Sequence, residues 1–414
     1  MVAAMSNAHP KRALEGVRVL DLSRVLAGPW ASQLLGDLGA DVIKIEKPGT
    51  GDDTRGWGPP FLTDAAGDTT DAAYFLSANR NKRSVAIDIA DPDGAALVRR
   101  IAARSHIVVE NFKVGGLRKY GLDYESLSKL NRALVYCSIT GFGQSGPYAP
   151  RAGYDYMIQA MGGLMSITGQ PDGAPGGEPM KVGVAVADLF SGMYAATGIL
   201  AALRHAERTG EGQHVDVALL DCQIAMLANQ ASNYLVSGKP PGRLGNAHPN
   251  IAPYQVFRTR DGHIVIAVGN DGQFAAFARA IGAPMLAADE RYGTNRARVA
   301  NRAALIAAIE PRMREKTTAE WLAAMEAATV PAGPINSIDA AFDDAQVKAR
   351  AMTAPMRRAD AAGKLMVAHP VKFSQTPARA DLSPPRLGSD TDETLRDFAD
   401  ATEIAALKAR GVIA

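Results

Sequence analysis

The chain has 414 residues, which exceeds the size at which one hydrophobic core usually stops growing, so two domains are expected. Hydrophobic residues make up 47% of it and charged residues 21%, a balance typical of a globular protein rather than a disordered one. With 45 basic and 43 acidic residues the formal net charge is only +2, which argues against a nucleic acid backbone as partner.

The sequence also indicates where the protein is expected to reside. No apolar run reaches the length of a membrane span, so no membrane association is expected. Residues 1–16 lack the long apolar core of a secretion signal and are interpreted as a frayed arm, although an organellar address stays open. Only two cysteines are present, Cys137 and Cys222, and both are expected to be buried thiols in a reducing cytoplasm.

The first half of the chain alternates strand and helix patterns. A βαβ unit is predicted first, and the same order then repeats. The predicted strands are 17–23, 41–47, 84–89, 106–112 and 133–140, and the predicted helices are 28–40, 93–105 and 126–132. This alternation predicts a doubly wound, Rossmann-like α/β domain with a mostly parallel sheet.

Glycine, proline and aspartate then dominate residues 148–179, a composition that suggests the surround of an active site. A helix over 189–208, a strand over 213–220 and a helix over 223–235 are expected next. A hairpin turning at Asp261-Gly262 opens a smaller α+β region with helices over 273–282 and 298–328. The expected domains are 1–205 (large), 206–227 (linker), 228–330 (small) and 331–414 (return linker and end of the large domain).

Residues 141–146 have the G-x-G-x-x-G spacing of a dinucleotide-binding motif. Pro147 and Pro150 follow, and a helix that starts within this loop is therefore not expected. A tight glycine loop is favoured, with no nicotinamide or flavin cofactor.

Basic residues cluster at the ends of predicted strands, where α/β folds bind ligands. They are Arg24, Lys44, Lys47, Arg80, Lys82 and Arg83. Such a cluster suits phosphates, while a solvated run of charge is the simpler alternative.

The remaining chemistry-bearing residues are few. The seven histidines show no metal-ligand spacing, so no metal site is expected. His248 lies in a glycine and proline loop, where a functional role is more common than in a strand. Asp188 precedes a long apolar helix pattern, and from the pattern alone a helix N-cap is favoured.

Seven ordered motifs together resemble the class III CoA-transferases, the family of formyl-CoA transferase and carnitine CoA-transferase. They include "LEGVRVLDLSRVLAGPWASQLLGDLGADVIKIEKPGTGDD", "NRNKRSVAIDI", "VVENFKVGGLRKYGL", "YCSITGFGQSGPY", "GYDYMIQAMGGLMSITG", "VGVAVADLFSGMYAATGILAAL" and "TGEGQHVDVALLD". The resemblance implies that Asp188 is a nucleophilic carboxylate that forms an acyl anhydride and then an aspartyl-CoA thioester. It further implies ring-shaped subunits in an interlocked homodimer.

The resemblance also transfers binding roles onto matching positions. Residues expected to line the coenzyme A channel or flank the reacting centre are Val25, Lys47, Ile87, Ile89, Asn111, Phe112, Lys119, Tyr154 and Asp155. The segment "VGNDGQF" matches a glycine-rich loop of the small domain, and its Gly269 and Gly272 would offer N–H groups to an oxyanion. Asp390, in "LGSDT", replaces the histidine of a late family pattern.

Four further segments, "RAGYD", "GLMSITG", "RLGNAHPNIAPYQVF" and "DGHIVIAVGNDGQF", resemble succinate:hydroxymethylglutarate CoA-transferase and related dicarboxylate enzymes within the family. This resemblance implies that succinyl-CoA is the donor. A dicarboxylate needs a cation or several hydrogen-bond donors at its distal carboxylate. The candidates are Arg24, Arg80, Asn246 and His248.

Two other functions share these motifs. An α-methylacyl-CoA racemase needs a histidine before Asp155, where this chain has Tyr154, whose unperturbed pKa of about 10 is ill suited to proton exchange. A catalytically silent CoA-binding protein is the third hypothesis, against which the retained Asp188 speaks.

Overall fold

A computed structural model describes residues 12–64, 66–379 and 381–414, so most of the expected N-terminal arm falls outside the described chain. The chain forms two compact units. The first combines the chain up to Leu164 with Val182–Ala231 and Arg350–Ala414, and the second combines Met165–Lys181 with Ser232–Ala349. Two helices, α6 (Leu164–Ile167) and α9 (Ala228–Ser237), contain points where the chain passes between the units.

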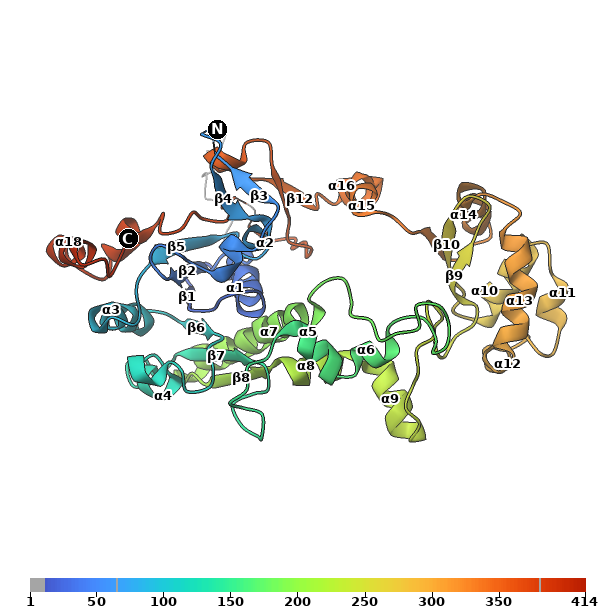
Figure 1. Cartoon of the computed structure of the whole chain (residues 1–414), viewed down its shortest axis with the longest axis horizontal. Coiled ribbons are helices and arrows are strands. Elements are labelled where there is room, and N and C mark those ends of the chain that lie inside the picture. The colour runs from blue at the N-terminus through green and yellow to red at the C-terminus, as the bar shows by residue number, and fades with distance from the viewer. Residues whose placement is uncertain (1–11, 65, 380) are drawn as a thin grey trace, which may run out of the picture. The chain divides into compact units, whose positions relative to one another are not determined.

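A six-stranded sheet forms the centre of the first unit, and all of its paired strands are parallel (Figure 1). Its strand order is β5-β2-β1-β6-β7-β8. The strands are β1 (Arg18–Asp21), β2 (Asp41–Glu46), β5 (Lys82–Ala86), β6 (Ile107–Glu110), β7 (Val135–Thr140) and β8 (His214–Ala218). The expected mostly parallel α/β sheet is therefore confirmed.

Helices cover both faces because successive strand residues turn to opposite sides. Val19 of β1 packs into one hydrophobic cluster and Leu20 into the other. The first cluster includes side chains of α1 (Ala27–Asp37) and α7 (Val186–Thr209), and the second includes side chains of α3 (Pro92–Ala103) and α18 (Ala401–Ala409). Gly192 lets α7 lie close to α1, since a Cβ there would come within 2.7 Å of the Ala27 carbonyl oxygen.

The other elements of the first unit are short. The helices are α2 (Ala73–Ser77), α4 (Tyr124–Leu127), α5 (Asp155–Met161), α8 (Leu219–Met226) and α17 (Thr391–Leu395). Two antiparallel pairs join β3 (Phe61–Thr63) to β4 (Thr69–Ala72) and β12 (Thr353–Pro355) to β13 (Leu365–Val367). Both cysteines are buried and free, as expected.

The second unit is built on a three-stranded antiparallel sheet of order β11-β10-β9. The strands are β9 (Tyr254–Arg258), β10 (His263–Ala267) and β11 (Ala332–Pro334). The helices are α10 (Asp271–Ala280), α11 (Met285–Ala288), α12 (Asn295–Ala300), α13 (Arg302–Met313), α14 (Thr318–Ala327), α15 (Ile338–Asp343) and α16 (Ala345–Ala349). Its core gathers around Phe257, Ile264 and Trp321.

Several expected boundaries differ from the structure. The segment 206–227, expected as a linker, contains β8, which pairs with β7 in the central sheet. The small domain was expected to end at residue 330, but β11 follows directly, pairs with β10, and belongs to the second unit, which runs to Ala349. The expected helix over 223–235 is two helices, which part at Ala228 with a backbone φ of 45°.

Helix α7 is long and apolar enough to cross a membrane by length and composition alone, contrary to the sequence expectation. It ends at Gly210, whose φ of 73° suits a glycine C-cap. Its Ala187, Ala195 and Ile199 are fully buried against the central sheet, and this packing accounts for the apolar composition of the helix.

Candidate active site

Asp188 lies in the first turn of α7, not at the N-cap favoured by the sequence pattern. The N-cap residue is Ala185, which has no side chain able to satisfy the free N–H groups of the first turn. Asp155 of helix α5 supplies that function instead. Its Oδ1 accepts hydrogen bonds from the backbone N–H of Ala187 at 2.8 Å and of Asp188 at 3.4 Å. Gln159 holds the other oxygen of Asp155 through a 2.7 Å hydrogen bond.

The Asp188 carboxyl group has an unusual affinity for protons. Burial leaves the residue 9% exposed, and the neighbouring Asp155 carboxylate adds electrostatic repulsion. Together they raise the pKa of Asp188 from 3.8 to about 7, with burial the larger cause. Asp188 is thus a carboxylate poorly stabilised by its surroundings, a property typical of reactive groups.

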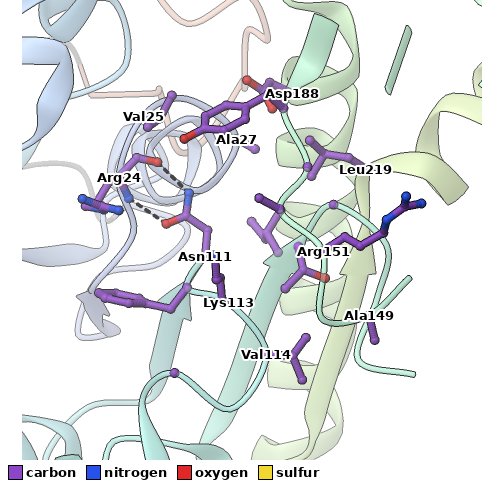
Figure 2. A pocket seen from close by; sticks show the side chains of 18 of the residues that line it. Arg24, Val25, Ala27, Asn111, Lys113, Val114, Ala149, Arg151, Asp188 and Leu219 are labelled. Atoms are coloured by element: carbon purple, nitrogen blue, oxygen red, sulfur yellow. Dashed lines mark hydrogen bonds between the residues drawn. The ribbon is translucent and has the colours of Figure 1, made fainter. Parts of the chain in front are cut away.

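Asp188 faces a cavity of about 410 Å³ in the first unit (Figure 2). Residues from the ends of β1, β6 and β7 line it, at the carboxyl edge of the parallel sheet, where α/β folds bind ligands. The residues of this first cavity that matter below are Arg24, Val25, Asn111, Phe112, Lys113, Lys119, Tyr120, Gly141, Arg151, Tyr154 and Asp188. Figure 2 shows Arg24 and Arg151 on opposite sides of the cavity.

Asn111 fixes one wall of this first cavity. Its side-chain oxygen accepts from the Arg24 N–H at 2.9 Å, and its side-chain nitrogen donates to the Arg24 carbonyl at 2.6 Å (Figure 2). Both polar backbone groups of Arg24 are therefore engaged. The Arg24 guanidinium lies over the Phe112 ring and pairs with Asp53 at 3.0 Å.

A second cavity of about 540 Å³ shares Arg24, Phe112 and Tyr120 with the first. Its lining combines the apolar Ile87 and Ile89 with the exposed Lys47. An apolar surface beside a cation suits a flat ring that carries phosphate groups. The shared residues place the two cavities next to each other along one ligand path.

The sequence-predicted coenzyme A residues divide between these cavities. Val25, Asn111, Phe112, Lys119 and Tyr154 line the first, and Lys47, Ile87, Ile89 and again Phe112 line the second. Asp155 lies behind Asp188, where it caps the helix. The structure thus brings the predicted residues together, while their contact with coenzyme A stays a prediction.

The predicted basic cluster does not form a phosphate site as a whole. Arg80 is buried and bonded through two nitrogens to Asp37, so its guanidinium is not available to a substrate carboxylate. Lys44 and Lys82 are also buried and pair with Asp52 and Asp21. Arg83 pairs with Asp41. Acidic partners therefore neutralise these four residues, which form neither a solvated run nor a phosphate site, whereas Arg24 and Lys47 are exposed and line the second cavity.

The remaining predicted residues lie in the second unit. The N–H of Gly269 donates to the Gln273 side chain at 2.8 Å, and Gly272 lies in the first turn of α10. Asn246 is exposed. The His248 ring packs on Tyr254, and burial, with the charge of Arg302, lowers the pKa of that histidine. Their catalytic and substrate roles stay predictions.

The glycine loop at 141–146 opens no helix, as expected. Its role is close packing, since a Cβ on Gly141 would come within 2.5 Å of the Gly153 backbone. This approach brings the segment 151–154 to the first cavity. Sequence reasoning missed Arg151 and Lys113 there; the only signal was the position of Arg151 just before "AGYD".

No group of three potential metal-ligating side chains is found in the described ranges. Asp390 contacts neither cavity; its carboxylate accepts from the Ser84 backbone N–H at 2.9 Å and ties the C-terminal segment to β5.

Comparison with known proteins agrees with this geometry. The sequence pattern of CoA-transferase family III matches residues 14–391. The chain is 54% identical to a succinate–glutarate CoA-transferase of Agrobacterium fabrum, over 95% of this chain and 97% of the relative. It is 44% identical to a succinyl-CoA:glutarate CoA-transferase of Mus musculus, over 99% of this chain and 92% of the relative. A crystal structure of a CaiB/BaiF family protein from Brucella suis superimposes with a TM-score of 0.82 at 51% identity, covering 94% of this chain and all of that one. The chain therefore belongs to the class III CoA-transferase family.

Proposed function

We propose that this protein transfers coenzyme A from succinyl-CoA to a dicarboxylic acid, with glutarate the foremost acceptor. One observation carries the proposal: a buried carboxylate, Asp188, faces a cavity that adjoins a second cavity, whose mixed lining includes the apolar Ile87 and Ile89 and the exposed Lys47. The names of the relatives in Agrobacterium and mouse supply the donor and acceptor.

The donor, succinyl-CoA, would extend through both cavities. The adenine and its phosphates would lie in the second cavity against Ile87, Ile89 and Lys47, and the pantetheine arm would pass Phe112 toward Asp188. Lys119, over the Tyr120 ring at the shared wall, would add a second cation. This placement brings the thioester carbon to the only carboxylate that lines the first cavity among the described residues.

The reaction proceeds by four acyl transfers. The Asp188 carboxylate attacks the thioester carbonyl, and the coenzyme A thiolate leaves as an anhydride of Asp188 and succinate forms. The thiolate then attacks the Asp188 carbonyl carbon, which releases succinate and leaves an aspartyl-CoA thioester. The acceptor carboxylate displaces the thiolate to give a new anhydride. The thiolate finally attacks the acceptor's carbonyl, which forms the new acyl-CoA and frees Asp188.

The raised pKa of Asp188 fits this chemistry. A carboxylate destabilised by burial and by Asp155 gains more from becoming a neutral anhydride or thioester than a solvated one does. The motif resemblance makes the N–H groups of Gly269 and Gly272 the candidates for stabilising the oxyanions, and the Gly269 N–H donates to the Gln273 side chain in this structure. Arg24, Asn246 and His248 remain the candidates for the distal carboxylate of the acceptor.

We further propose an interlocked homodimer of ring-shaped subunits in the cytoplasm. Large apolar side chains on α5, α7 and α8 are exposed in the single chain: Tyr156, Met157, Phe190, Met193, Tyr194 and Ile224. Contiguous exposed apolar side chains of this size are typical of subunit interfaces.

Mass spectrometry of coenzyme A products tests the transfer. The purified protein is mixed with succinyl-CoA and one acid at a time: glutarate, 3-hydroxymethylglutarate, malate, citramalate, mesaconate, itaconate, oxalate or carnitine. New dicarboxylyl-CoA is expected, with glutaryl-CoA formed fastest. Asp188→Ala should abolish product and retain coenzyme A binding. Full activity in that variant would rule out Asp188 as the nucleophile.

A further inference from the structure

Val25 has an unusual backbone conformation in the wall of the first cavity. Its φ is 70°, in the left-handed region that a β-branched residue rarely adopts. Such a conformation costs free energy and persists only where surrounding contacts impose it. The segment that contains it, residues 23–25, links β1 to α1 and borders both cavities.

Five hydrogen bonds hold the backbone of this segment, one of which runs from the Ser23 N–H to Asp21 Oδ1 at 2.9 Å. Asn111 engages the N–H and carbonyl of Arg24. On one side, Lys44 Nζ donates to the Ser23 carbonyl at 2.8 Å. On the other, Asp52 Oδ1 accepts from the Val25 N–H at 3.2 Å. Lys44 and Asp52 thus grip the residues before and after Arg24.

Lys44 and Asp52 are also paired with each other. Lys44 Nζ lies 2.9 Å from Asp52 Oδ2, and the side chains are 1% and 0% exposed. Thr54 donates its N–H and its hydroxyl to Asp52 Oδ1 as well. Burial alone would raise the pKa of Asp52, but Lys44 and the Thr54 hydrogen bonds outweigh it and lower the pKa to about 2, so the carboxylate stays charged.

A buried ion pair contributes little net stability compared with apolar side chains of the same volume, because both charges lose their hydration. A contribution to the stability of the fold therefore does not explain why this ion pair is present. Its geometry suggests a positioning role instead. Through Lys44 and Asp52, one ion pair connects β2 to the Ser23 carbonyl and to the Val25 N–H, which flank Arg24.

We infer that the Lys44–Asp52 ion pair is a positioning device for the acyl-CoA site, which holds Val25 in its left-handed conformation and so fixes the wall that the two cavities share. Both residues also border the second cavity, but this role requires no contact between their side chains and the substrate. The inference rests on the proposed function for the identity of the ligand.

Binding of coenzyme A to purified full-length variants, measured by calorimetry, tests the inference without requiring turnover. Asp52→Ala removes the acceptor of the Val25 N–H, and the Kd is expected to rise at least about tenfold, the scale of one strained residue. Asp52→Asn keeps an oxygen at that position and should restore most of the affinity. Where the transfer is active, the KM for succinyl-CoA should rise with the Kd, while kcat changes less.

A glycine at position 25 isolates the conformational role. Glycine adopts positive φ without strain, so in a Val25→Gly background the effect of Asp52→Ala should shrink to within about twofold. Asp37→Ala is the matched control, since it breaks the buried pair with Arg80 away from both cavities. It should lower the melting temperature and leave the Kd unchanged.

Lys44→Met combined with Asp52→Ala removes both charges, should Asp52→Ala alone not fold, and is expected to show the same loss of affinity. An equal Kd in the wild type and in the folded Asp52 variants would overturn the inference, as would the same loss in both Val25 and Gly backgrounds. A wild type that binds coenzyme A but transfers none would overturn only the proposed function. A wild type that binds none would overturn both.

Discussion

Asp188 combines burial, a carboxylate neighbour and access to a cavity, and this combination predicts a cost in stability. Its folded pKa of about 7 exceeds the ordinary 3.8, so the folded state retains a proton that the unfolded state loses as the pH rises. The contribution that protonated Asp188 makes to the free energy of unfolding is therefore lost as the pH rises from about 4 to about 7. Above that range the buried anion destabilises the protein.

Asp188→Asn cannot ionise and should be more stable than the wild type. At pH 8 the expected gain is at least about 1 kcal/mol, and it should shrink as the pH falls toward 5. Urea unfolding at several pH values measures the difference. Asp68→Asn, which alters an exposed carboxylate, should show no comparable gain. A variant at position 188 that is less stable at every pH would contradict the raised pKa.

Residue roles could be predicted only in part from the sequence. From the pattern alone, an aspartate ahead of an apolar helix favours an N-cap, and only the motif resemblance pointed to a nucleophile. The prediction that Arg80 binds the substrate was wrong, because Arg80 is paired with Asp37. Asp37 lies on another element, so no local sequence pattern reveals this pair. Asp52 gave no sequence signal, because its role depends on the backbone conformation of Val25.

At the scale of elements, helix α7 depends on α5 for its start. Asp155 at the first turn of α5 accepts the N–H groups of Ala187 and Asp188, and its charge raises the pKa of Asp188. The two effects can be separated, because asparagine keeps the acceptor and removes the charge.

Asp155→Asn should shift the acidic limb of the pH profile of kcat/KM to lower pH, since Asp188 then ionises more readily. Asp155→Ala should shift it likewise and also destabilise the protein by about 1 kcal/mol through loss of the cap. Initial rates across pH 5 to 9 and thermal unfolding measure the two effects. An unchanged limb in both variants would show that the Asp155 charge does not act on Asp188.

The elements themselves were largely predictable. Buried parallel strands are near-continuous apolar runs, and the five strands expected in the first half all occur in the central sheet. The errors fall where tertiary contacts decide. Strand β11 is only three residues of alanine, glycine and proline, and it exists because β10 offers it a partner. The break at Ala228 carries no glycine or proline signal.

At the scale of the whole molecule, the exposed apolar side chains of α5, α7 and α8 predict self-association. Multi-angle light scattering at micromolar concentration should give twice the chain mass of 43.6 kDa. Met193→Glu, which places a charge in that surface, should weaken the dimer, whereas Arg132→Glu on an exposed turn of the same unit should not. A stable, active monomer would contradict the proposed interlocked assembly.

The central claim is that coenzyme A transfer passes through a covalent bond to Asp188. The most direct measurement is peptide mass spectrometry after the protein is mixed with succinyl-CoA and quenched with hydroxylamine, which converts an activated aspartyl group to a hydroxamate. The tryptic peptide 182–204 contains one carboxyl side chain, that of Asp188. A hydroxamate on this peptide, dependent on succinyl-CoA, is the predicted result. Transfer that proceeds with this peptide unmodified, or with the label on another residue, would contradict the account.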